Sequence, residues 1–249
     1  MRAFFPVVLL GLLCVPSVGF ADPDPQTATH TDSSTAPPEP QKPVTQLSPV
    51  VVTATRTETP VAETAASITV MTAEDIERQQ SETVTEVLRS IPGLDLAQNG
   101  SRGTTTSVFT RGAESDQTLV LIDGVEVNSV TVGAFDFSNL TTENIDRIEV
   151  LRGGGGTLYG SQAVGGVINI LTKKGEGAPT MSVSAEGGNG STHREVLSFS
   201  GGQGIVGFSG AVASIDTDGF RSFNDGYRNF STNLRLDVTP IPTGAFRSF

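Results

Sequence analysis

The sequence predicts an α+β domain, a small mixed sheet with short helices, followed by the first antiparallel strands of a transmembrane β-barrel. Three observations lead to this prediction. Residues 119–123 read LVLID and are nearly all apolar, which is typical of a central strand buried on both faces. Residues 84–91 carry one apolar stripe at helical spacing. Residues 230–238 alternate apolar and polar side chains after their first three positions, which is typical of a barrel strand.

Composition narrows the class of protein. The chain has 27 acidic and 16 basic residues and a net charge of −11, which argues against nucleic-acid binding. Residues 1–21 combine a basic start, an apolar stretch and a small-x-small cleavage site, so they are predicted to be a secretory signal peptide. The only cysteine, Cys14, lies inside that segment, so the mature chain would have no disulfide. Neither of the two histidines has companions that suggest a metal site.

The segment after the signal peptide is predicted to be flexible. Residues 22–46 are rich in Pro, Thr, Asp and Ser and show no periodicity, so they cannot bury enough apolar surface to offset the entropy of ordering. Residues 47–54 then favour an extended backbone without an obvious partner strand. An unpaired strand after a flexible leader suits β-augmentation by another protein, although an ordinary first strand of the domain is the alternative.

The next segment is predicted to contain short strands and helices. Residues 66–71 are expected to form a strand, and Thr72 is expected to cap a helix together with Asp75. Ser81 is expected to cap the second helix, which Pro92 and Gly93 end. Further expectations are exposed loops at 98–106 and 128–137, a strand at 107–111, a turn at 123–124 and a short helical turn at 143–145 capped by Thr142.

The chain is organised around residues 146–174. The part at 147–151 has the period-two pattern of a half-buried strand, and a glycine-rich turn leads into a second apolar run at 167–171. The glycine spacing from 155 to 160 is that of a phosphate loop. A phosphate loop is nevertheless disfavoured, because Ser161 stands where its lysine should be and the residues after the loop are β-rich rather than helical.

Together these motifs resemble the plug domain of TonB-dependent outer-membrane receptors. In that family VLRSIPGL, VLIDGV, an E-x-x-R-G turn, LYGS and GGVINI recur in this order, and here they begin at residues 87, 120, 149, 158 and 165. Gly153 and Gly154 depart from the family's Arg-Gly-Pro. The resemblance implies a signal peptide (1–21), a linker (22–46), a TonB box (47–55), a plug (56–175) and the first strands of an incomplete barrel (176–249) in a truncated chain.

The resemblance also implies functional residues. TonB would bind Leu47, Ser48, Pro49, Val50, Val51, Val52, Thr53 and Ala54, although Pro49 departs from the family pattern and removes one backbone donor. Substrate would bind the two exposed loops through Gln98, Asn99, Ser101, Arg102, Thr104, Asn128, Ser129, Thr131 and Phe135. Arg111, Arg152 and Glu149 would seat the plug, the two arginines against glutamates of the barrel wall beyond residue 249; ordinary surface arginines are the alternative. No catalytic residue, cofactor or metal is expected.

The implied function is energy-coupled uptake of a scarce nutrient across the outer membrane of a Gram-negative bacterium, with TonB and its inner-membrane energising complex as the partner. The motifs look most like those of cobalamin transporters, and a ferric-siderophore receptor is the first alternative. A soluble secreted plug-like binding protein or a non-functional fragment is the second alternative. A receptor that also signals would need a folded domain before the TonB box, and residues 22–46 are too short and polar for one.

Overall fold

The computed structural model describes residues 50–51, 59–60, 67–153, 156–219 and 225–239. The predicted signal peptide, the predicted linker and most of the predicted TonB box lie outside the described residues. No helix in these described ranges is long and apolar enough to cross a membrane.

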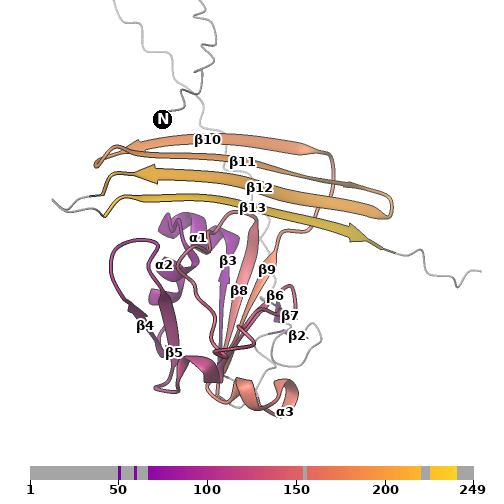
Figure 1. The fold of residues 1–249 in the computed structure, drawn as a ribbon. Helices are drawn as coiled ribbons and strands as arrows, with labels where there is room; N and C mark the ends of the chain where they lie inside the picture. The colour runs from indigo at the N-terminus through magenta and orange to yellow at the C-terminus, as the bar shows by residue number, and fades with distance from the viewer. Residues whose placement is uncertain (1–49, 52–58, 61–66, 154–155, 220–224, 240–249) are drawn as a thin grey trace, which may run out of the picture. The chain divides into compact units, whose positions relative to one another are not determined.

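The centre of the first domain is a five-stranded mixed sheet in the order β3-β8-β9-β6-β7. Its strands are β3 (Ser67–Thr72), β6 (Thr118–Ile122), β7 (Val125–Glu126), β8 (Ile145–Arg152) and β9 (Gly166–Thr172). Strands β6 and β9 run parallel, and the other neighbours are antiparallel. Figure 1 shows β3, β8 and β9 side by side, with β3 at the edge. The apolar run LVLID therefore lies mostly in the interior strand β6, as predicted, and β8 and β9 are the other two interior strands.

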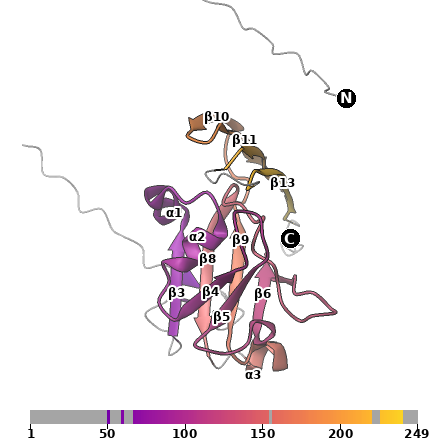
Figure 2. The same ribbon diagram turned by 60° about the vertical axis from the view of Figure 1, so that its left-hand side comes forward.

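Two short helices cover one face of this sheet. They are α1 (Ala73–Gln79) and α2 (Val84–Arg89), and Figure 2 shows both beside the sheet. Val84, Val87 and Leu88 of α2 are fully buried. They pack in one core with apolar residues of β6, β8 and β9, so the predicted stripe is the face that holds α2 on the sheet.

Of the two predicted helix caps, one is confirmed and the other is wrong. Thr72 caps α1, and its reciprocal pairing with Asp75 forms the predicted capping box. Ser81 does not cap α2, because the cap is Thr83, whose hydroxyl accepts a hydrogen bond from the backbone of Glu86 while the Glu86 carboxylate turns back to the cap. The carbonyl of Ser81 instead accepts a hydrogen bond from the hydroxyl of Thr142.

Shorter elements complete the domain. A hairpin of β4 (Leu94–Gln98) and β5 (Thr106–Thr110) flanks the loop at 98–106, and its buried Leu94 and Val108 join the helical core. Helix α3 (Gly156–Tyr159) and the 3-10 turns η2 (Ser115–Gln117) and η3 (Ser161–Ala163) follow. Residues 143–144 form a hydrogen-bonded turn into β8 rather than the predicted helical turn, because Ile145 already belongs to the strand.

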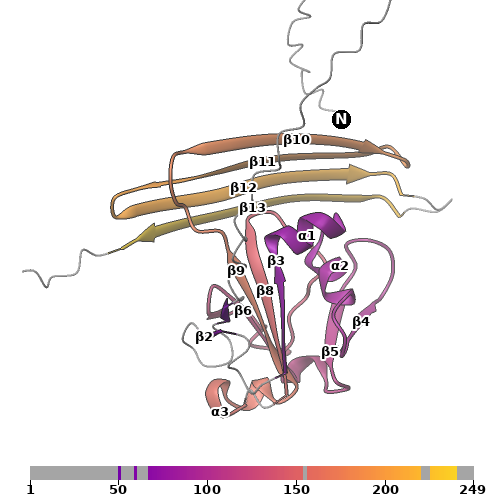
Figure 3. The same cartoon turned by 180° about the vertical axis from the view of Figure 1, so that it is seen from behind.

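The C-terminal part forms a separate antiparallel sheet in the order β10-β11-β12-β13. Its strands are β10 (Thr180–Gly188), β11 (Thr192–Gln203), β12 (Val206–Thr217) and β13 (Tyr227–Val238), the long arrows of Figures 1 and 3. The predicted fold class is thus confirmed as an α+β domain followed by antiparallel strands.

A short tether, residues 173–179, joins the two sheets. Gly175 lies so close to the backbone of Phe208 and Gly201 that a side chain could not fit there. The backbone N–H of Gly202 donates to the carbonyl of Gly177 over 2.9 Å. The tether is therefore fixed against β11 and β12.

Candidate functional site

The two faces of the four-stranded sheet differ in polarity. On β13 the exposed positions include Phe230, Leu234, Leu236 and Val238, whose side chains are 61–71% exposed. The alternate, half-buried positions are Tyr227, Asn229, Ser231, Asn233, Arg235 and Asp237. By strand register, Met181, Val183 and Leu197 share the exposed face. The sheet therefore turns a largely apolar face outward and a mainly polar face, with small or apolar residues of β12 such as Ala213 and Ile215, toward the first domain.

The two ends of this sheet also differ. Strands β11 and β12 are joined by the tight turn at 204–205, which we call the short-turn end. Strands β12 and β13 are joined by the connection at 218–226, which we call the long-connection end, and the turn between β10 and β11 lies at the same end.

At the long-connection end, the first predicted loop contacts β13 through two consecutive residues. Arg102 donates to the carboxylate of Glu82 over 2.5 Å, and its guanidinium carbon lies 5.6 Å from the ring centroid of Tyr227. Gly103 has φ +80°, and a Cβ added there would overlap the Tyr227 ring. The hydroxyl of Tyr227 donates to the side-chain oxygen of Asn139 over 3.0 Å. Of the predicted ligand-binding residues in this loop, Arg102 is therefore engaged within the protein.

The rest of the first loop is held by short-range bonds. The amide of Gln98 donates to the carbonyl of Ser101 over 2.9 Å, and the hydroxyl of Thr104 donates to the same carbonyl over 2.8 Å. The side chain of Asn99 is exposed. This loop therefore has a defined shape and still presents polar groups at its surface.

In the second predicted loop, Asn128 has a structural role. Its side-chain oxygen accepts from the backbone of Val120 over 2.7 Å, and its amide donates to the carbonyls of Thr118 and Gly133 at 3.0 and 2.6 Å. Phe135 packs edge-on against Phe137, with ring centroids 4.8 Å apart.

At the tip of this second loop, the hydroxyl of Ser129 accepts from the backbone N–H groups of Thr131 and Val132. Ser129, Thr131 and the apolar Val130 and Val132 are exposed. The tip, rather than Asn128, is thus the accessible part of the loop.

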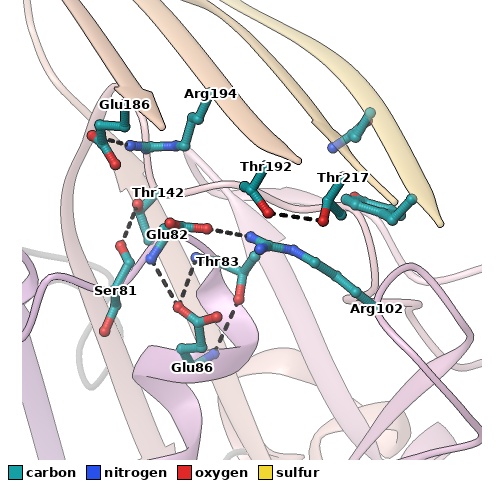
Figure 4. Close-up of polar contacts among 12 residues, drawn as sticks. Ser81, Glu82, Thr83, Glu86, Arg102, Thr142, Glu186, Thr192, Arg194 and Thr217 are labelled. Atoms are coloured by element: carbon teal, nitrogen blue, oxygen red, sulfur yellow. Dashed lines mark hydrogen bonds and ion pairs between the residues drawn. The ribbon is translucent and has the colours of Figure 1, made fainter. Parts of the chain in front are cut away.

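A second polar contact at the long-connection end joins the domain to β11. Arg194 on β11 forms ion pairs with Glu143 at 2.5 Å and with Glu186 on β10 at 2.7 Å. The side chains of Arg194 and Glu143 are only 16% and 7% exposed, so this pair is largely shielded from solvent. Figure 4 shows Arg194 and Glu186 near Thr142, whose backbone N–H donates to the carbonyl of Glu82.

A third contact lies toward the short-turn end. Arg235 on β13 donates through Nη1 to the Asp123 carboxylate over 2.8 Å and to the Thr172 carbonyl over 3.0 Å. Its other nitrogens bind both carboxylate oxygens of Asp237 at 2.7 and 2.9 Å. Asp123 also accepts from the backbone and hydroxyl of Thr172, so it links the ends of β6 and β9 in the five-stranded sheet to β13.

The three residues predicted to seat the domain have other contacts. Arg111 donates to the hydroxyl of Ser67 over 3.0 Å. Arg152 donates to the hydroxyl of Thr69 over 2.6 Å and to the carbonyl of Pro92. Burial and the nearby charge of Arg111 lower the pKa of Arg152. These hydrogen bonds all remain within the first domain, so the two arginines form a positively charged pair away from β10–β13.

Glu149 is fully buried inside the central sheet. Arg147 donates to its carboxylate over 2.9 Å and to that of Asp146 over 2.8 Å. Burial disfavours the charged guanidinium, but the two carboxylates outweigh burial and raise the pKa of Arg147. The side-chain oxygen of Asn169, across from Glu149 on β9, is buried without a hydrogen-bond partner among the described residues.

The predicted TonB box is described only at Val50–Val51, which form β1. This strand pairs antiparallel with β2 (Thr59–Pro60). The other predicted TonB-binding residues lie outside the described residues.

Sequence reasoning did not identify Arg194, Arg235, Glu143 or Asp123 as residues that join the two sheets. A signal was present for Arg235, because it occupies a polar position of the alternating strand and so must point away from the apolar face. Its partner Asp123 could not be found in this way, since the two lie 112 residues apart in the sequence.

Comparison with known proteins identifies the class. Residues 60–167 match the family model described as the TonB-dependent receptor plug domain. The chain therefore belongs to the TonB-dependent receptors, and its first domain is the plug of that family.

The relatives point to one branch. The chain is 41% identical over 175 residues to the vitamin B12 transporter BtuB of Vibrio cholerae, covering 70% of this chain and 28% of that protein. It is 44% identical over 151 residues to the BtuB of Vibrio vulnificus, covering 61% and 24%. The chain thus spans about a quarter of the length of these curated relatives.

Solved structures show the same fold in siderophore receptors. The pyoverdine outer membrane receptor FpvA of Pseudomonas aeruginosa superposes with a TM-score of 0.60 at 26% identity, covering 69% of this chain and 25% of that one. The siderophore receptor PirA of the same species gives a TM-score of 0.56 at 30% identity, covering 72% and 32%.

Proposed function

We propose that the chain supplies the plug and the first wall strands of an outer-membrane receptor that takes up cobalamin with energy delivered through TonB. The observation that carries the proposal is the 41% identity over 175 residues to a vitamin B12 transporter, which covers 70% of this chain. The structural similarity to siderophore receptors, at 26–30% identity, supports the fold and keeps a ferric siderophore as the second candidate ligand.

The four-stranded sheet supports a place in the membrane. Its apolar face runs from Phe230 to Val238, which is about 26 Å along an extended strand at roughly 3.3 Å per residue. Barrel strands are tilted by about 35–45°, so this length corresponds to a height of about 20 Å, which is close to the roughly 25 Å outward apolar band of an outer-membrane barrel with a polar interior. A soluble binding protein would leave this face in water, so the sheet argues against the soluble alternative.

The two ends of the sheet suggest which side is outward. Outer-membrane barrels have short periplasmic turns and longer extracellular loops. The connection at 218–226 would then lie outside the cell and the turn at 204–205 in the periplasm. Because Arg102 and Gly103 contact Tyr227, the loop at 98–106 would face outward, where a ligand arrives.

The partner strand for TonB would be supplied by residues 47–54. Pairing of β1 with β2 occupies one edge of Val50–Val51, and a strand has two edges. TonB would either add to the other edge or replace β2 through the same backbone groups.

Arg111 and Arg152 would help to seat the plug. Their hydrogen bonds within the described residues go to hydroxyl and carbonyl oxygens rather than to carboxylates. Two positive charges of this kind suit seating against acidic residues of wall strands that this sheet does not include.

Uptake assays test the proposal. A strain without its own cobalamin receptor would receive the complete receptor or a variant lacking residues 47–54, and uptake and surface binding of cobalamin would be measured separately. The expected result is that the deletion abolishes uptake and leaves binding intact. Normal uptake by the deletion variant would contradict the role of this segment. Binding of a ferric siderophore in place of cobalamin would transfer the proposal to the second ligand.

A further inference from the structure

Tyr227 of β13 packs against Arg102 and Gly103 and so connects a plug loop to a wall strand. Tyr227 is the first residue of β13 and directly follows the connection at 218–226. The ring leaves no space for a side chain at Gly103, whose φ of +80° also favours glycine. The loop backbone and the ring are therefore fitted to each other at this point.

Arg102 is held from its other side by the plug. Its Nη2 donates to Glu82 over 2.5 Å, and both side chains are about one-third exposed, at 34% and 33%. Glu82 itself is fixed through its backbone, because its N–H donates to the carboxylate of Glu86 and its carbonyl accepts from Thr142. Figure 4 shows Arg102 extending toward Glu82 at the start of α2. The ion pair and the stacked ring fix the direction of the guanidinium, whose Nε is buried without a hydrogen-bond partner among the described residues.

We propose that Arg102 and Gly103 are positioning residues, which fix the loop at 98–106 between Glu82 and Tyr227 so that its exposed part can bind a ligand. This inference rests on the proposed uptake function and gives Arg102 a supporting role in place of the ligand contact expected from the sequence. The surface that meets the ligand would then be the exposed part of the loop, including Asn99, and the tip of the second loop.

The first test measures loop order without any ligand. A spin label would be placed at the exposed position 105 by Thr105→Cys in the complete receptor in outer membranes. The only cysteine of this chain lies in the predicted signal peptide, so the label is specific within it. Glu82→Gln and Arg102→Gln are each expected to increase the mobility of the label. Unchanged mobility in both variants would overturn the proposal, whatever the ligand proves to be.

The second test separates positioning from ligand contact through equilibrium binding of cobalamin. Positioning predicts that Glu82→Gln weakens binding as Arg102→Gln does, by about fivefold each, and that the double variant is no weaker than either single one. Loss of affinity in Arg102→Gln alone would overturn the proposal in favour of direct contact. If the unchanged receptor binds a ferric siderophore instead, the cobalamin assignment fails and the same series is measured with that ligand.

The third test examines the contact between Gly103 and the ring of Tyr227. Gly103→Ala should weaken binding by about tenfold because the new methyl group displaces Tyr227. Gly204→Ala is the matched control, since Gly204 has a similar φ of +64° but no atom within 4 Å of the added Cβ. Tyr227→Phe should keep most of the affinity, whereas Tyr227→Leu should not. Equal effects of Gly103→Ala and Gly204→Ala would show that backbone strain alone is responsible and would overturn the role of the ring.

Discussion

Replacing Arg235 by alanine should loosen the plug at its contact with β13. Arg235 gives the plug one charged hydrogen bond to Asp123 at 2.8 Å and one to the carbonyl of Thr172 at 3.0 Å, and its side chain is 19% exposed. A hydrogen bond to a charged group contributes about 1.5–3 kcal/mol. Asp123 keeps the backbone and hydroxyl of Thr172 as donors, so the lower part of this range applies. We expect a loss of about 2 kcal/mol, or roughly 30-fold in the local opening equilibrium.

Hydrogen exchange in the membrane-embedded receptor measures this opening. The backbone N–H of Thr172 donates to Asp123, and that of Asp123 donates to Ile170 at 2.9 Å. Both amides should exchange up to about 30-fold faster in Arg235→Ala if local opening limits exchange. Peptides covering β6 and β9 would report the change.

The same strand provides a matched control. Arg228 is also paired with an aspartate, Asp216, but its side chain is 79% exposed and the pair has no plug residue in it. Arg228→Ala should leave the plug amides unchanged. Asp123→Asn removes the charge while tolerating the φ of +49°, since asparagine adopts positive φ readily, and it should reproduce the effect of Arg235→Ala. Equal exchange in the Arg235 and Arg228 variants would refute the reasoning.

Three further predictions concern the plug itself. Gly166→Ala should destabilise the central sheet by about 3 kcal/mol in urea unfolding, because the added methyl group would overlap a backbone oxygen of β8. Glu149→Gln should cost about 3 kcal/mol in the same assay, since it leaves the half-buried charge of Arg147 without its buried partner; a cost near zero would contradict the buried pair. The backbone N–H of Thr72 lowers the pKa of Asp75, so the ionised carboxylate stabilises α1 above about pH 4, and this stabilisation is lost as the pH falls below that value. Hydrogen exchange in α1 should therefore become faster in acid, and Asp75→Asn should abolish this pH dependence.

Much of the plug could be predicted because its signals are local. Two of the interior strands, β6 and β9, are mostly apolar runs, and the stripe of α2 has the spacing of one helical face. The cap of α2 was also encoded locally, because Thr83 stands three residues before Glu86 and makes a capping box, whereas Ser81 has no such partner. Choosing Ser81 was therefore an error of interpretation rather than a lack of information.

The contacts between the two sheets could not be predicted from local patterns. Alternation in β13 places Arg235 and Tyr227 on the polar face, but it does not say which plug residue each one meets. That depends on how the two sheets are packed. Asn128 shows the same limit, because an exposed polar loop residue and a side chain bonded to strand β6 and to its own loop look alike in the sequence.

The tether at 173–179 has a mechanical consequence for the plug. Fully extended, it could span only about 25 Å, and it is held to the backbone of β11 and β12, where Gly175 fits without space for a side chain. A domain attached through so short a segment cannot move away from β11 and β12 as a rigid body that rotates about residues 173–179. Force applied at the N-terminal segment would therefore meet a fixed point at the opposite end of the plug, and the domain would carry the full tension between the two.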